Sequence, residues 1–233
     1  MSEKCRLAAL SKVEITQVAK KTPVFERTRP FPPDLLFDES NWTKHFVPAD
    51  GLAEWIAKTL MDESSPLYNE DHKHLHFADI EYLWAAVPNN RQMRRVVGQC
   101  EEVTFRAGAW QKGRQEQQMK EWFGRVPAYL ITLDAHYARE CSDAEFCSLV
   151  EHELYHIAHK LDEFDQPAFT KDGLPKIGIQ SHDVEEFVGI VRRYGVGAAA
   201  GKTAALVEAA KRAPEIGNVD IARMCGTCIL RAA

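Results

Sequence analysis

The stretch that decides the fold is VEHELYHI, residues 150–157. Within it, His152 and His156 are separated by one helical turn, so on a helix both imidazoles lie on one face and can bind the same metal ion. Glu153 completes the pattern H-E-x-x-H, in which the glutamate takes a proton from a water that zinc activates. The stretch therefore predicts a helix that carries a zinc site and a general base.

The residues before the motif predict where this helix begins. Ser142 and Glu145 have the spacing of a capping box, in which each side chain satisfies a backbone N–H of the first turn. No helix breaker follows, so we predict a helix of about 18 residues that ends near Lys160. Its apolar stripe comprises Phe146, Leu149, Val150, Leu154 and Ile157.

A hydrolytic zinc site needs three protein ligands and one open position for water. His159 continues the motif, but three ligands on one straight helix would span roughly 10 Å, too far for bonds of about 2.1 Å to a single ion. We expect His159 to be an outer or surface residue. The remaining candidates lie on a second predicted helix, from about Ser181 or Asp183 to Tyr194, and are His182, Glu185 and Glu186.

Ahead of the motif, the pattern predicts a small twisted sheet over about residues 75–135. Apolar runs bounded by turn residues indicate strands at 80–87, 96–105 and 126–134. Gly98 within a strand indicates a bulge or the close approach of another group. We also predict an amphipathic helix at 52–60, a loop or exposed helix at 111–120, a hairpin around Asp172-Gly173 that borders the cleft, and a helix over about 202–212.

Length and composition divide the chain and exclude some partners. We expect a proline-rich extension at residues 1–50 that wraps the surface, a metal-binding domain at 51–195 and a helical tail at 196–233. The formal charge of −5 gives no electrostatic reason to expect binding to nucleic acid. The sequence contains no run of about 18 apolar residues, so no membrane span is predicted. The charged N-terminus lacks a signal-peptide core and the six cysteines are scattered, so we expect a cytoplasmic protein.

Three further patterns favour plain structural roles. His72, His74 and His76 alternate, which would allow a second metal site, but a polar strand edge or loop is the interpretation we favour. Gly201-Lys202-Thr203 resembles the end of a phosphate-binding loop, yet Val196 holds the position where that loop needs glycine. Cys225 and Cys228 form a single C-x-x-C without a second pair, which favours two incidental thiols.

The motif, the Asp-Gly-x-Pro turn at 172–175 and the segment SHDVEEF at 181–187 together resemble the phage metallopeptidase family over about residues 75–195. The chain is also similar to SprT-like proteases, although Asp183 replaces their glycine and Phe187 comes one residue later. These resemblances favour His182 as the third ligand. A similarity to peptidases of the ImmA/IrrE type would instead favour Glu185 or Glu186, and an unused carboxylate would orient a ligand histidine.

The resemblance implies an α+β, zincin-like fold, with a small twisted sheet packed against the active-site helix and a second ligand-bearing helix. It implies a Zn²⁺-dependent endopeptidase that acts on a protein or peptide, with Glu153 passing a proton from water to the leaving amine. For the oxyanion, we expect Tyr194 as the donor, with Arg193 and Tyr155 as other candidates. The alternatives are a non-catalytic binding protein with a structural metal and a metal hydrolase that acts on another type of bond.

Overall fold

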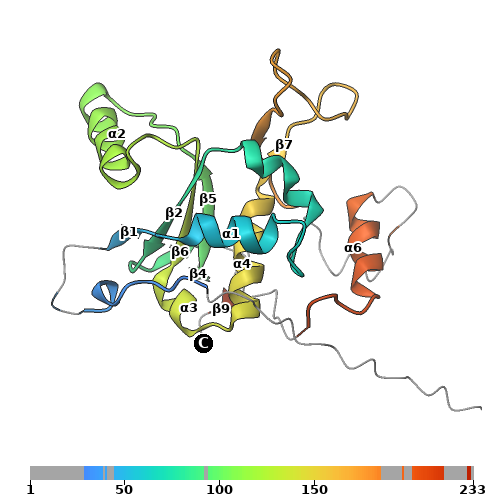
Figure 1. Ribbon diagram of the computed structural model, residues 1–233, viewed down its shortest axis with the longest axis horizontal. Helices are drawn as coiled ribbons and strands as arrows, with labels where there is room; N and C mark the ends of the chain where they lie inside the picture. The colour runs from blue at the N-terminus through green and yellow to red at the C-terminus, as the bar shows by residue number, and fades with distance from the viewer. Residues whose placement is uncertain are drawn as a thin grey trace, which may run out of the picture.

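A mixed four-stranded sheet forms the centre of the protein (Figure 1). The computed structural model describes residues 29–38, 40, 45–91, 94–184, 196, 201–217 and 230–231. The strand order is β1-β2-β6-β5, which places β5 at one edge; β2 and β6 run parallel, and the two outer strands run antiparallel to their neighbours. These strands are β1 (Phe46–Pro48), β2 (Ile80–Ala85), β5 (Gly98–Glu102) and β6 (Tyr129–Asp134).

Two smaller sheets and several helices complete the described fold. Strands β3 (Asn89–Arg91), β4 (Arg94–Val96) and β9 (Leu230–Arg231) form one small sheet, and β7 (Ile157–His159) pairs with β8 (Ile177–Ile179). The α-helices are α1 (Leu52–Leu60), α2 (Ala109–Phe123), α3 (Ala135–Glu140), α4 (Asp143–Tyr155) and α6 (Lys202–Ala210), with 3₁₀ helices η1 (Asp34–Leu36) and η2 (Glu70–Phe77). The α+β class predicted from the sequence is confirmed.

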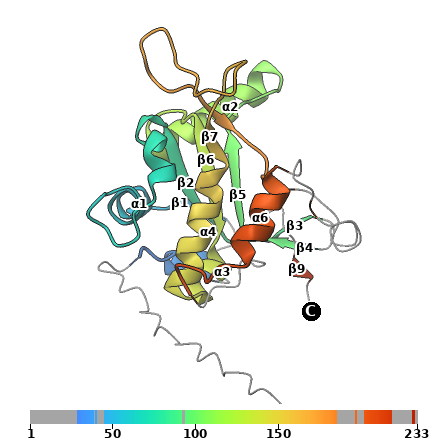
Figure 2. The ribbon, with the colours of Figure 1, turned by 90° about the vertical axis from the view of Figure 1, so that its right-hand side faces the viewer.

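The hydrophobic core lies between the central sheet and helices α1 and α4 (Figures 1 and 2). Phe146 of α4 is fully buried and packs against Trp55 of α1 and Trp84 of β2, with ring centroids 5.7 and 5.9 Å away. Burying one such side chain stabilises the fold by about 1.5–3 kcal/mol. This packing fixes α4 against the sheet along its apolar face.

A buried arginine ties the start of α4 to the chain before η1. Arg29 is only 3% exposed and donates to the Asp143 carboxylate and to the carbonyls of Ala138 and Cys141 at 2.7–2.8 Å. Its guanidinium also lies 4.5 Å from the centre of the Phe146 ring, a cation–π distance. The turn between α3 and α4 is therefore held from outside as well as by its own backbone.

The sheet and α1 agree with the sequence, with adjusted ends. Strands predicted at 80–87 and 126–134 are confirmed as the shorter β2 and β6, and 111–120 lie inside the exposed helix α2. The strand predicted at 96–105 is divided, because β4 ends at Val96 and β5 begins at Gly98 in another sheet. Val97 makes the link, and its carbonyl accepts the Asp134 N–H at 2.9 Å.

The helix predicted to run to Lys160 ends at Tyr155, so that prediction was wrong at its C-terminal end. His156 caps the helix, and the next residues leave it to form β7. Gln180 supplies the reason: its N–H donates to the His156 carbonyl and its side-chain amide to the Tyr155 carbonyl, both at 2.8 Å. These bonds satisfy carbonyls that the helix end leaves unpaired, which favours ending it there.

The alternating histidines lie on η2 and not on a strand, which corrects that part of the interpretation. Asn69 caps η2 by accepting the Asp71 N–H, and His72 is fully buried while His76 is exposed. The turn at Asp172-Gly173 is present, with Gly173 at φ 78°. However, β8 pairs with β7 and not with residues 168–170. Around the turn, Phe169 forms an isolated β-bridge with Pro175.

Helix α6 confirms the predicted helix after Gly201. None of the helices in the described parts of the chain combines the length and apolarity needed to cross a membrane. The second ligand-bearing helix beyond residue 184, and the pair Cys225 and Cys228, lie outside the described residues. The division of the chain at residues 50 and 195 stays a prediction.

Candidate metal centre

Helix α4 begins where the sequence predicted and presents its motif toward the edge of the sheet. The capping box is present: the Glu145 carboxylate accepts the Ser142 N–H at 2.9 Å, and the Ser142 hydroxyl accepts the Glu145 N–H at 3.3 Å. Because the apolar face of α4 is buried in the core, the half-buried His152 and His156 lie on its other side.

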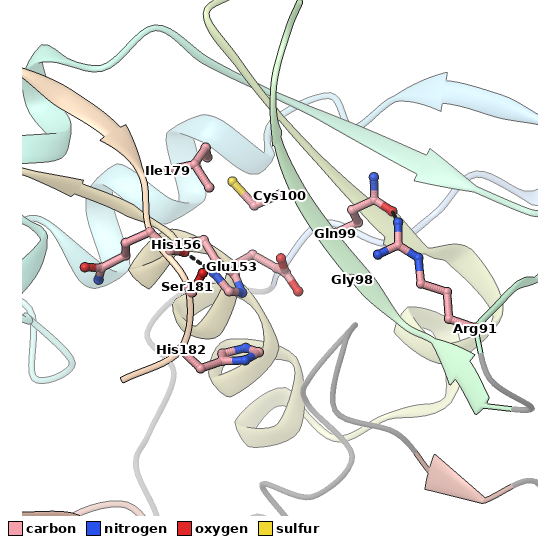
Figure 3. A pocket seen from close by; sticks show the side chains of 10 residues that line it. Arg91, Gly98, Gln99, Cys100, Glu153, His156, Ile179, Ser181 and His182 are labelled. Atoms are coloured by element: carbon pink, nitrogen blue, oxygen red, sulfur yellow. Dashed lines mark hydrogen bonds between the residues drawn. The ribbon is translucent and has the colours of Figure 1, made fainter. Parts of the chain in front are cut away.

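His182, from the segment after β8, joins the two motif histidines. One ring nitrogen from each of His152, His156 and His182 lies within 4.8 Å of the others. The Nε2 atoms of His152 and His182 are 3.3 Å apart. Two donors on a tetrahedral zinc with bonds of about 2.1 Å lie about 3.4 Å apart, so this spacing fits two ligands of one ion. Figure 3 shows His156 and His182 at the wall of a shared cavity.

The hydrogen bonds and charge states of two histidines suit metal binding. His156 Nδ1 lies 2.9 Å from the Gln180 carbonyl, so Nδ1 carries the proton and Nε2 is left for a metal. Burial lowers the pKa of His152 to about 4, with further lowering by His156 and His182. A low pKa keeps the imidazole neutral, which is the form that coordinates a metal.

Glu153 is the buried acid of the site. It is 1% exposed, and burial raises the pKa of its carboxyl to about 8, although a backbone hydrogen bond from Cys100 lowers it. Its Oε1 atom is buried without a hydrogen-bond partner among the described residues. An unpaired buried oxygen is costly, so this atom points to a missing polar partner such as a water or an ion.

Gly98 of β5 makes room for this carboxylate. A Cβ atom at Gly98 would lie 2.5 Å from Glu153 Oε1 and 2.9 Å from Leu149 Cδ1. Any side chain there would displace the glutamate, so the predicted close approach at Gly98 is confirmed.

His156, His182 and Glu153 border a cavity of about 310 Å³ between β5 and the segment that follows β8 (Figure 3). Its volume is near the lower end of the range of small-molecule sites, about 300–1,000 Å³. The cavity therefore has room for a short piece of a larger substrate. Its lining residues are Arg91, Gly98, Gln99, Cys100, Glu153, His156, Ile179, Gln180, Ser181 and His182.

Other predicted residues lie elsewhere. His159 is outside the histidine group and bonds through Nε2 to the Ala168 carbonyl at 2.8 Å. Tyr155 does not line the cavity; its hydroxyl donates to Asp71 at 2.8 Å. In the described parts of the chain, the histidines of η2 form no second metal group. Glu185, Glu186, Arg193 and Tyr194 fall outside the described residues.

Gln180 is the functional residue that sequence reasoning missed. Its carbonyl orients His156, while its amide groups hold the end of α4. No side-chain pattern signals this role, because the decisive contacts use backbone atoms. Its position two residues before His182 was the one available indication.

Comparison with known proteins agrees with this geometry. The model of the family described as "Putative phage metallopeptidase" matches residues 53–211, more than half of the chain. The chain belongs to this family. The matched region contains α4, β5, β8 and His182, so every residue of the candidate centre lies within it. No curated protein and no solved structure matches the chain. Membership indicates a metal-dependent peptidase that acts on proteins or peptides.

Proposed function

We propose that this protein is a zinc-dependent endopeptidase in which His152, His156 and His182 hold Zn²⁺ and Glu153 is the general base. The observation that supports this best is the histidine group beside a buried carboxylate oxygen that lacks a partner. When bound, Zn²⁺ lowers the pKa of a water molecule and polarises the carbonyl of the scissile bond.

Glu153 accepts the proton of the attacking water and passes it to the leaving amine. Burial raises the pKa of this carboxyl in the metal-free fold, and the positive charge of bound Zn²⁺ would lower it again, so that the carboxylate is available to accept a proton near neutral pH. Gln180 keeps His156 oriented through its carbonyl, and Gly98 leaves the space in which the glutamate lies. Tyr194 is proposed as the donor to the oxyanion, while Glu185 and Glu186 are alternatives for the third ligand.

The substrate is a protein or peptide, and we propose that the enzyme acts in the cytoplasm. The cysteines Cys100, Cys141 and Cys147 are free thiols, as expected in a reducing compartment. Cleavage of a peptide that is acetylated at its N-terminus and amidated at its C-terminus would support endopeptidase action. A requirement for a free terminus would contradict it.

The deciding experiment compares the zinc-loaded protein with Glu153→Gln. We expect the variant to lose about 10²- to 10⁴-fold in turnover, the usual contribution of a general base, while its zinc content and circular dichroism stay unchanged. Glu151→Gln is the matched control, because Glu151 is adjacent on α4 but accepts from Asn69 at 2.9 Å and does not line the cavity.

Three outcomes would contradict the proposal. Full activity in Glu153→Gln would exclude this glutamate as the base. A wild-type protein that binds zinc but cleaves no peptide would favour the non-catalytic binding protein. Hydrolysis confined to esters or other non-peptide bonds would favour the third alternative, a different metal hydrolase.

A further inference from the structure

Arg91 brings a positive charge to the wall of the catalytic cavity. It is the last residue of β3 and lines the same cavity as Glu153, His156 and His182. In Figure 3, Gly98 lies between Glu153 and the pair formed by Arg91 and Gln99.

The guanidinium is held in place without being neutralised. Its Nη2 donates to Gln99 Oε1 at 3.2 Å, and the same oxygen accepts from Asn89 Nδ2 at 3.3 Å. Among the residues that the structure describes, Arg91 makes no ion pair, and it is the one lysine or arginine in the lining of this cavity. Arginines that do pair with a carboxylate are Arg29, Arg95, Arg125 and Arg139.

An arginine in this condition is suited to bind an anion. Gln99 occupies one N–H group, and the planar guanidinium keeps further N–H donors that match the two oxygens of a carboxylate. The cavity has room for one or two residues of a peptide. A carboxylate on Arg91 would therefore belong to a residue close to the scissile bond.

We propose that Arg91 binds a substrate carboxylate and makes this enzyme selective for peptides with an acidic group next to the cleaved bond. The inference rests on the proposed peptidase function. The carboxylate belongs to an aspartate or glutamate side chain or to the C-terminus of a peptide, and the test separates these sources. Arg91 is thus a specificity-determining residue and takes no part in the proton transfers.

The test uses the full-length, zinc-loaded protein and a mixture of peptides, with cleavage sites read by mass spectrometry. Half of the mixture is amidated at the C-terminus. We expect cleavage sites enriched in aspartate or glutamate at one fixed position, and a loss of about ten-fold in kcat/KM for acidic peptides in Arg91→Gln. Cleavage next to a free C-terminus that disappears on amidation would assign the carboxylate to the C-terminus; it would support the role of Arg91 and contradict the endopeptidase part of the proposed function.

Arg91→Glu should reverse the preference toward lysine and arginine, which a purely structural role would not produce. Arg114→Gln is the control, because Arg114 is exposed on α2 and does not line the cavity. Cleavage without acidic preference, or a preference unchanged in Arg91→Gln, would overturn this inference and leave the proposed function standing. No cleavage of any peptide by the wild type would overturn the proposed function, and this inference with it.

Discussion

Glu153→Gln in the metal-free protein should change how the free energy of unfolding depends on pH. The carboxyl of Glu153 has a pKa of about 8 in the fold, against 4.5 for the unperturbed group, mainly because it is buried. Between these values the folded protein keeps a proton that the unfolded chain releases. The free energy of unfolding therefore falls as pH rises, and the contribution of the neutral carboxyl is lost by the time pH passes about 8.

The free energy of unfolding falls by about 1.4 kcal/mol per pH unit while the folded protein holds one proton more than the unfolded chain. His152 sets the lower limit of the pH range in which this effect can be seen alone. Because its pKa is lowered in the fold, His152 reduces the free energy of unfolding only when the pH falls below its unperturbed pKa of 6.5. From pH 6.5 to 8 the wild type should thus lose about 2 kcal/mol. Glutamine has no proton to release, so the free energy of unfolding of the variant should hardly change over this pH range.

The assay is urea unfolding at several pH values after removal of metal with a chelator. Glu102→Gln serves as the control, since Glu102 is an exposed glutamate on the same strand as Gly98. Parallel curves for the wild type and Glu153→Gln would refute the reasoning. Added zinc should flatten the wild-type curve, because a nearby cation stabilises the carboxylate and lowers its pKa.

Two further substitutions test the geometry of the site. Gly98→Ala should displace Glu153 and so lower kcat/KM by about 100-fold. It should also lower the free energy of unfolding, measured with urea, by about 1–3 kcal/mol. Gly113→Ala is the control and should keep full activity, because a Cβ at Gly113 would have nothing within 4 Å. An active, stable Gly98→Ala enzyme would contradict the close approach. His182→Ala should weaken zinc binding more than about 100-fold by competition titration, and His159→Ala should leave it unchanged. Equal losses in both would contradict the ligand assignment.

Local patterns predicted the parts of the site that local forces determine. The start of α4 follows from Ser142 and Glu145, which satisfy each other within a single turn. The pairing of His152 with His156 follows from helical periodicity. The end of α4 was missed, because Gln180, distant in sequence, supplies the hydrogen bonds that replace the next turn.

In the sheet too, local sequence patterns predicted some strands, while features that depend on distant partners were missed. Apolar runs located β2 and β6, since buried strands must be apolar over their length. The break between β4 and β5 was not predicted, because it depends on which partner each half pairs with. The place of Arg91 beside the cavity likewise comes from β3 lying near Gln99, a contact that no motif encodes.

The hairpin of β7 and β8 separates His156 from His182 along the chain. On the proposed ligand set, a ribosome that has just released α4 therefore holds a polypeptide with two of the three nitrogen donors, and the third emerges only after both hairpin strands. Because His182 comes three residues after Ile179, the pairing of β8 with β7 brings it toward His156 in the growing chain. The long segment that joins the two strands, which includes the Asp172-Gly173 turn, contains none of the proposed donors, so its sequence can vary without changing the ligand set.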